Sequence, residues 1–196
     1  MKKNRSLTVK KQLKEAFTYL KESKNHIYIS ILIFLFGAVF GFLFQEKLTF
    51  INDIIKELML KTANLNPVEL VFFILQNNLQ SALLAVIFGI AFGIFPIFNA
   101  LANGTVIGYV LALTYKVAGL SSWWRILPHG IFELPAIFIS LGLGLKLGLT
   151  IFTKNSKKGK EFKSRLYQSL NVFLMIVIPL LIIAAIIEGI LISLIN

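Results

Sequence analysis

The chain has 196 residues, of which 57% are apolar, and it carries a formal net charge of +11. It contains no cysteine, which excludes disulfides, zinc–thiolate sites and cysteine nucleophiles. The apolar and basic residues are segregated, because long uncharged runs alternate with short segments rich in Lys and Arg. Apolar runs of about 18–25 residues have the length that crosses a bilayer as a helix. The composition therefore predicts an all-α fold, a polytopic bundle of transmembrane helices in a cell membrane.

The apolar runs predict about five spans in a single transmembrane domain, residues 27–196, which follows a basic amphipathic segment, residues 1–26. The first span comes after a long polar segment and lacks a cleavage signal, so it is predicted to be a retained anchor. Pro96 and Asn99 predict a tight hairpin between the second and third spans. The predicted spans are residues 27–44, 79–98, 100–115, 128–152 and 171–195.

The distribution of Lys and Arg predicts the orientation of these spans. Eight basic residues lie in the first 26 residues and six lie between Lys154 and Arg165, whereas the first external segment balances its lysines with acidic residues. Because basic segments stay in the cytoplasm, the N-terminus and the loop at about 153–168 are predicted there. An odd number of spans then puts the C-terminus outside. Lys146 is expected to extend its amine to the cytoplasmic surface.

Two segments look amphipathic and are predicted to lie at the membrane interface. Near the N-terminus, Leu13, Phe17 and Leu20 recur at helical spacing among lysines, which favours anionic lipid head groups over nucleic acid as a partner. The second segment is external, at about 45–66. It ends in Asn66-Pro67-Val68-Glu69, a helix start, which leaves open whether residues 67–78 are interfacial, re-entrant or part of the second span.

Glycine pairs spaced four residues apart occur in four of the predicted spans. Small residues at this spacing let helix backbones approach closely in lipid, where little hydrophobic force holds helices together. We expect these glycines to pack helices tightly within the chain or across a homodimer. The pairs are Gly37 and Gly41, Gly89 and Gly93, Gly104 and Gly108, and Gly144 and Gly148.

Polar residues inside the spans are the candidate site. His129 and Glu133 are four apart and share a helix face, and a charged side chain at membrane depth costs about 2.5–3.5 kcal/mol unless it is paired or hydrated. The predicted topology brings several such residues to one layer near the outer leaflet: Asn77, Asn78, His129, Glu133 and Glu188. This cluster is either a structural network or a site for a substrate, ion or partner. Asn103 and Gly104 are predicted at the opposite, cytoplasmic end, as the start of a helix.

Recognisable catalytic patterns are absent from the sequence. It has two histidines and no His-Glu-x-x-His pattern, and neither a nucleophile elbow nor a phosphate-binding loop is present. An acid–base role for His129 and Glu133 would lack both a nucleophile and a metal. The prediction is therefore a non-enzymatic protein without a metal or cofactor.

Several of these motifs together resemble the stage II sporulation protein M family. They are Asn77-Asn78, Asn103-Gly104, and Pro128-His129-Gly130 followed by Glu133 and Pro135, within residues 77–148. The resemblance implies a multi-pass membrane protein that acts as a scaffold, since founding members serve spore engulfment together with peptidoglycan-degrading partners. The leading prediction is a homodimeric scaffold that recruits proteins or lipids. The alternative is a small transporter or channel with a polar site around His129 and Glu133.

Overall fold

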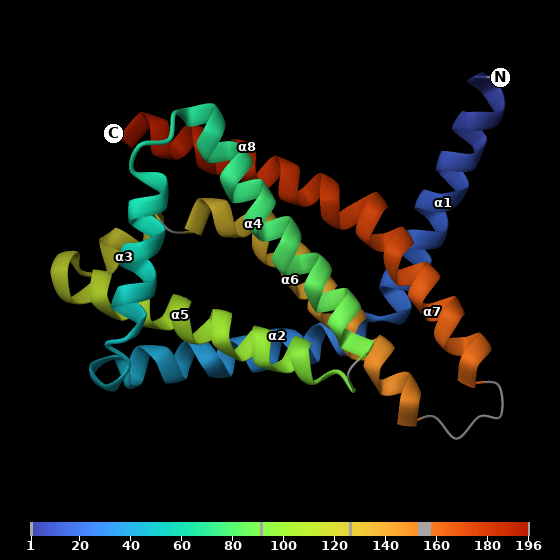
Figure 1. Ribbon diagram of the computed structural model, residues 1–196, viewed down its shortest axis with the longest axis horizontal. Helices are drawn as coiled ribbons and strands as arrows, with labels where there is room; N and C mark the ends of the chain where they lie inside the picture. Colours follow the sequence, from blue (N-terminus) through green and yellow to red (C-terminus); the bar gives the residue numbers. More distant parts are fainter. Residues whose placement is uncertain (1, 91, 126, 153–157, 196) are drawn as a thin grey trace.

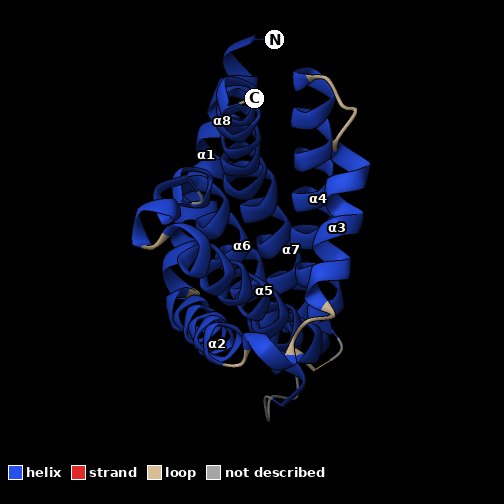
Figure 2. Ribbon diagram, turned by 90° about the vertical axis from the view of Figure 1, so that its left-hand side faces the viewer, coloured by secondary structure: helices blue, strands red, loops and turns tan. Residues whose placement is uncertain are grey.

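The structure is a computed structural model of the chain, and it describes residues 2–90, 92–125, 127–152 and 158–195. Side chains are described for these residues except 2–7, 122, 124–125, 127–129 and 191–195. The described residues form helices joined by short turns, without a strand (Figure 2). The α-helices are α1 (Lys2–Glu22), α2 (Lys24–Leu43), α3 (Ile51–Thr62), α4 (Pro67–Ile87), α5 (Ile94–Ala118), α6 (Leu127–Gly148), α7 (Lys158–Val172) and α8 (Ile178–Ile195).

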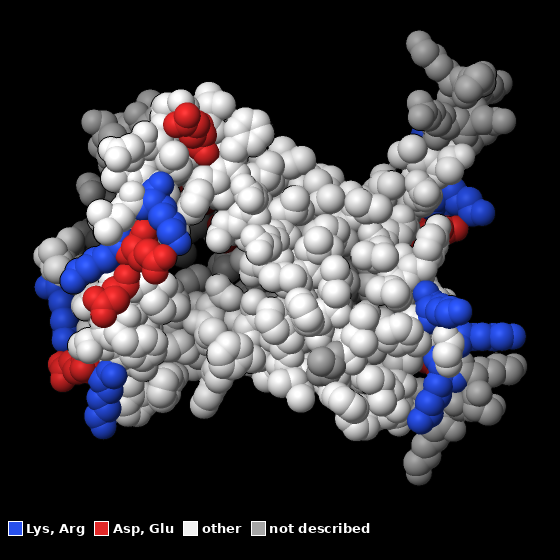
Figure 3. All heavy atoms as spheres, viewed as in Figure 1, with Lys and Arg blue, Asp and Glu red and all other residues white. Residues whose placement is uncertain are grey.

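Five helical segments are long and apolar enough to cross a membrane, which confirms the predicted bundle. They run along the long axis of the molecule, so the two termini lie at opposite ends (Figure 1). Charged side chains gather at these two ends and leave an uncharged band between them (Figure 3). Within that band large apolar side chains such as Leu32 and Phe36 are exposed, as expected of a surface that faces lipid. The segments are Lys24–Leu43, Pro67–Ile90, Ile94–Ala118, Gly130–Phe152 and Lys158–Ile190.

Helix α6 is the central element of the bundle. It packs against α2, α4, α5 and α8, and nearly every residue from Ala136 to Gly148 is buried. Seen from the end of the bundle, α6 lies in the middle of the other helices (Figure 2). Gly142, Gly144 and Gly148 let neighbouring segments approach the α6 backbone closely, which is consistent with this central position.

The two ends of the bundle differ in construction. The basic end carries α1 and α7, which pack against each other, and the Asn171 side chain donates a hydrogen bond of 2.9 Å to the carbonyl of Gln12. The α3 end carries α3 and the C-terminal part of α8. In both views α3 runs across the end of the bundle and not along its axis (Figures 1 and 2).

The backbones of α2 and α5 cross at glycines. A β carbon at Gly41 would come within 2.0 Å of the carbonyl oxygen of Thr105, and one at Gly108 within 1.9 Å of that of Ala38. Gly37 and Gly104 meet the facing helix in the same way. Gly89, Gly93, Gly144 and Gly148 bring the end of α4 and the start of α5 against α6. These close approaches all lie within one chain; what they contribute to stability stays a prediction.

Residues 67–78 extend the second span. The side-chain oxygen of Asn66 accepts hydrogen bonds from the amides of Val68 and Glu69, both at 3.0 Å, and the Glu69 carboxylate accepts one of 2.9 Å from the Asn66 amide. This reciprocal cap and Pro67 in the first turn confirm the predicted helix start. Helix α4 then continues unbroken to Ile87. Of the three alternatives for residues 67–78, the structure therefore favours the one in which they are part of the second span.

The turn between the second and third spans lies earlier than predicted. Phe92 and Gly93 adopt left-handed conformations, with φ of 57° and 72°, and α5 begins directly after them. Pro96, expected at the hairpin, lies in the first turn of α5, where a proline is tolerated. Asn103 and Gly104 are therefore inside a long helix, and the prediction that they start one is wrong. Pro135 likewise lies within α6, which continues through it.

The predicted basic loop at about 153–168 is mostly helix. From Lys158 the chain is already helical in α7, and a single π-helical turn, Phe173–Val177, joins α7 to α8 without a break. Residues 153–157 lie outside the described residues. The fifth span is thus the membrane part of a longer rod that begins in the basic segment.

Candidate binding cavity

A cavity of about 400 Å³ lies between α4, α5, α6 and α8, under α3 at the α3 end of the bundle. Helix α3 contributes Ile55, Leu58, Met59 and Thr62, which follow one another at helical spacing. On the face drawn in Figure 3 the surface is hollowed beside the charged residues at this end. The volume is in the range of about 300–1,000 Å³ that is usual for small-molecule sites.

Most of the polar residues singled out in the sequence lie on this cavity. Asn77 and Asn78 reach it from α4, Glu133 from α6 and Glu188 from α8. The Asn77 amide nitrogen is 3.4 Å from the Asn78 side-chain oxygen, and Asn78 is buried whereas Asn77 is exposed. Residues that are far apart in the sequence therefore meet because the helices that carry them run alternately up and down the bundle.

Glu133 and Glu188 face the cavity without a protein partner among the described residues. No hydrogen bond or ion pair within the described part of the chain reaches either carboxylate, and both side chains are partly buried. No lysine, arginine or histidine is among the described residues that line the cavity. Since an uncompensated carboxylate at membrane depth is costly, the two groups are stabilised by water or a ligand in the cavity or by taking up a proton.

The remaining predicted residues have different places. The side chain of His129 lies outside the described residues, so its expected pairing with Glu133 stays a prediction. Gly130 and Pro135, on α6, are not among the residues that line the cavity. Asn103, which was assigned to the opposite end, does line the cavity. Its amide nitrogen donates a hydrogen bond of 2.8 Å to the side-chain oxygen of Asn99. The error follows from the misplaced start of α5, which moved Asn103 to the wrong depth.

Sequence reasoning missed Ser81 and Phe73, which also line the cavity. Ser81 lies four residues after Asn77 and Phe73 four residues before it, so the three share one face of α4. That spacing was available in the sequence. The spacing alone did not predict a shared site, because the sequence left the position of residues 67–78 relative to the membrane open.

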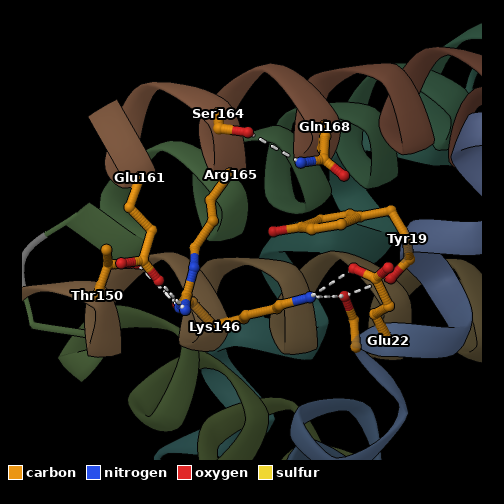
Figure 4. Close-up of polar contacts among 9 residues, drawn as sticks. Tyr19, Glu22, Lys146, Thr150, Glu161, Ser164, Arg165 and Gln168 are labelled. Carbon is orange, nitrogen blue, oxygen red and sulfur yellow. Dashed lines mark hydrogen bonds and ion pairs between the residues drawn. The ribbon is translucent and has the colours of Figure 1, made fainter. Parts of the chain in front are cut away.

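A second polar group, the Lys146 cluster, lies at the basic end (Figure 4). It consists of Tyr19, Glu22, Ser23, Lys146, Thr150, Glu161 and Arg165. The Lys146 ammonium donates a hydrogen bond of 3.0 Å to the Ser23 hydroxyl and lies 4.0 Å from the Glu22 carboxylate. It is also 3.8 Å from the centre of the Tyr19 ring, a cation–π contact. Burial raises the pKa of the Tyr19 phenol, which keeps this ring neutral. Lys146 is only 7% exposed, so its predicted extension to the surface is wrong.

Arg165 closes the Lys146 cluster from α7. Its guanidinium donates to the Lys146 carbonyl and to the Thr150 hydroxyl, each at 3.1 Å, and it pairs with Glu161 one turn earlier (Figure 4). The charges of this cluster therefore have partners within the protein, and the cluster ties α1 and α7 to the end of α6. This is the arrangement of a structural network.

The polar groups of the cavity are few and lie among apolar side chains. Within the described residues no group of three or more His, Asp or Glu side chains is placed to hold a metal ion. The cavity offers two carboxylates, three asparagine amides and the hydroxyls of Thr62 and Ser81, among apolar side chains. A mostly apolar cavity with a few convergent polar groups is the usual form of a small-molecule site.

The fold defines a multi-pass α-helical membrane protein with a cavity inside the bundle. The model of the family "Stage II sporulation protein M" matches residues 14–191, which is most of the chain. The protein therefore belongs to that family, as the sequence motifs had indicated.

Two archaeal proteins are similar to this chain over most of their length. "Uncharacterized protein MJ0706" of Methanocaldococcus jannaschii is 30% identical over 191 residues, covering 90% of this chain and 86% of the relative. "Uncharacterized protein MJ0793" of the same organism is 32% identical over 171 residues, covering 84% and 92% respectively. No solved structure matches the chain.

Proposed function

We propose that this protein binds a small polar solute in the α3-end cavity and moves it across the membrane, as a small transporter or channel. The observation that carries the proposal is the position of Glu133 and Glu188, which face a cavity of about 400 Å³ without a protein partner among the described residues. Ionisable residues inside a membrane usually mark the pathway of a substrate, ion or proton. If Glu133 and Glu188 had a purely structural role, we would expect them to have ion-pair or hydrogen-bond partners in the protein, as the charged groups of the Lys146 cluster do.

The basic end of the bundle is proposed to face the cytoplasm. Lys10, Lys14 and Lys21 are exposed on α1, and α7 adds further lysines at the same end, whereas at the α3 end Lys61 is paired with Glu57 at 2.7 Å. Because an excess of Lys and Arg stays in the cytoplasm, the N-terminus lies inside and the C-terminus outside. The cavity then lies in the outer half of the membrane and receives its solute from outside.

The test is solute uptake into proteoliposomes that contain the purified protein, with radiolabelled sodium, rubidium and methylammonium as probes. We expect uptake of at least one probe above protein-free vesicles. Glu133→Gln and Glu188→Gln should abolish it, because each removes one of the charges that compensate a cation. Glu57→Gln is the matched control, since this carboxylate is exposed on α3 and already paired with Lys61.

Uptake of all probes at the level of protein-free vesicles would contradict transport. An uptake rate that neither substitution changes would contradict transport through this cavity. Equal reconstitution of the variants is checked by their sedimentation with the vesicles.

The scaffold role, with a homodimer that recruits protein or lipid partners, is a second candidate. The observation that favours it is an exposed apolar stripe on α1, formed by Val9, Leu13 and Phe17, with Lys10 and Lys14 beside it. Anionic lipid head groups fit such a surface through both its charge and its apolar side chains. In this case Leu13→Ser with Phe17→Ser would weaken retention of anionic lipid, measured by native mass spectrometry. Glu133→Gln would leave that retention unchanged.

A further inference from the structure

We infer that the α3-end cavity takes an ammonium group carried on an apolar body, either a free organic amine or the amine head group of a lipid. This inference rests on the proposed function, because it names the class of solute for the same cavity. It is carried by the composition of the cavity wall and by its position beside the hollow in the surface.

The charge of the wall selects a cation. Glu133 and Glu188 approach the same space from α6 and α8, and no basic residue is among the described residues that line it. The amide oxygens of Asn77 and Asn103 add acceptors in the same wall. An anion would meet two carboxylates in a region of low dielectric constant, where like charges repel strongly.

The apolar part of the wall selects an organic cation over a bare metal ion. Most of the lining residues are apolar, among them Leu70, Phe73, Ile107 and Ile137. Calcium takes about six to eight oxygen ligands at short distance, and no group of three acidic or histidine side chains among the described residues is placed to begin such a shell. An ammonium group needs fewer oxygen partners, and the lining includes an aromatic ring, that of Phe73, a residue type that can attract a cation. The aliphatic side chains then cover the body of the ligand.

The position of the cavity is compatible with two origins of the ammonium group, a dissolved amine or a lipid head group. Helix α3 covers it at the end of the bundle, and the surface beside α3 is hollowed on a face that runs along the long axis of the molecule (Figure 3). That face is a side wall of the bundle, so the opening is within reach of the outer leaflet as well as of water. A dissolved alkylamine and the amine of phosphatidylethanolamine both present an ammonium group next to apolar carbon.

The test is isothermal titration of the full-length protein in phosphatidylcholine nanodiscs with hexylammonium, hexanoate and hexanol as matched probes. Hexylammonium is expected to bind, and hexanoate and hexanol to bind at least about thirtyfold more weakly, because they lack the charge that the carboxylates compensate. Glu133→Gln and Glu188→Gln should each weaken hexylammonium by a similar factor, whereas Glu57→Gln leaves it unchanged. Comparison of the probes on the unsubstituted protein keeps the test decisive if a variant fails to fold.

Equal binding of hexanol or hexanoate would overturn the inference, and so would displacement of hexylammonium by sodium at equal concentration. A lower apparent affinity in nanodiscs that contain phosphatidylethanolamine assigns the lipid amine as a competitor, while an unchanged affinity assigns the free amine; both support the ammonium class. Uptake of sodium that depends on Glu133, without hexylammonium binding, would refute this inference and leave the proposed transport standing. Hexylammonium binding without uptake of any probe would support this inference and contradict the proposed transport.

Discussion

The Lys146 cluster and the α3-end cavity both place charged groups inside the same helical bundle, and they compensate the cost in different ways. At the basic end, Lys146 meets Ser23, Glu22 and the Tyr19 ring within 4.0 Å. At the α3 end, Glu133 and Glu188 face open volume without a bonded partner among the described residues. Charges that are paired within the protein hold helices together, whereas charges without a protein partner are available to bind a ligand. The comparison therefore separates a structural polar group from a candidate site.

The largest effect is expected at Tyr19. Tyr19→Ala removes a side chain that is only 2% exposed, together with its ring contact to Lys146. The free energy of unfolding should fall by about 3–5 kcal/mol, as for other large-to-small changes in a core. Thermal unfolding followed by intrinsic fluorescence measures the loss. Tyr167→Ala is the control, because Tyr167 is 60% exposed on α7; an equal loss in both variants would contradict a structural role for the cluster.

An intermediate effect is expected at Gly108, which holds α5 against α2. A β carbon there would lie 1.9 Å from the Ala38 carbonyl oxygen, so Gly108→Val must separate two helices. We expect a loss of about 1–3 kcal/mol in the free energy of unfolding, and weaker ligand binding in the cavity that α5 lines. Gly159→Val is the control, since nothing lies within 4 Å of the added β carbon. Thermal unfolding that is the same in both variants would show that the close approach contributes nothing to stability.

The smallest effect on stability is expected in the cavity. Glu133→Gln and Glu188→Gln remove charges that no described residue compensates, so the unfolding temperature should stay the same or rise. Lys146→Gln, by contrast, should lower it, because Glu22 and the Tyr19 ring lose a bonded cation. A clear loss of stability in both glutamate variants would make the cavity a second structural network and remove the distinction between the two regions.

The parts of this fold that could be predicted from the sequence depend on local pattern. Apolar runs gave the five spans because a bilayer fixes the length of a helix that crosses it. Asn66, Pro67 and Glu69 gave the start of α4 because a helix cap is built from adjacent residues. Topology then placed Asn77, Asn78, Glu133 and Glu188 at one depth, although whether they form a site stays a prediction.

The remaining features depend on contacts that no local pattern records. The turn at Phe92 and Gly93 lies inside a continuous apolar run, so hydropathy could not locate it, and Asn103 was assigned to the wrong end in consequence. Lys146 is buried because Tyr19 and Ser23, more than a hundred residues earlier in the chain, cover it. Helix α7 was taken for a loop because its basic composition concealed its helical spacing.

The measurement that tests the central claim most directly is the labelling of a cysteine placed in the cavity. The chain has no cysteine of its own, so Ser81→Cys gives a single reactive thiol among the lining residues. Cationic and anionic methanethiosulfonate reagents of similar size are added from the α3 side of oriented vesicles, with Leu60→Cys as the exposed control. We predict that Ser81→Cys reacts, and that the cationic reagent is faster by about tenfold until Glu133→Gln and Glu188→Gln are introduced together. No reaction at Ser81→Cys while Leu60→Cys reacts, or equal rates for both reagents, would contradict an open site for cations.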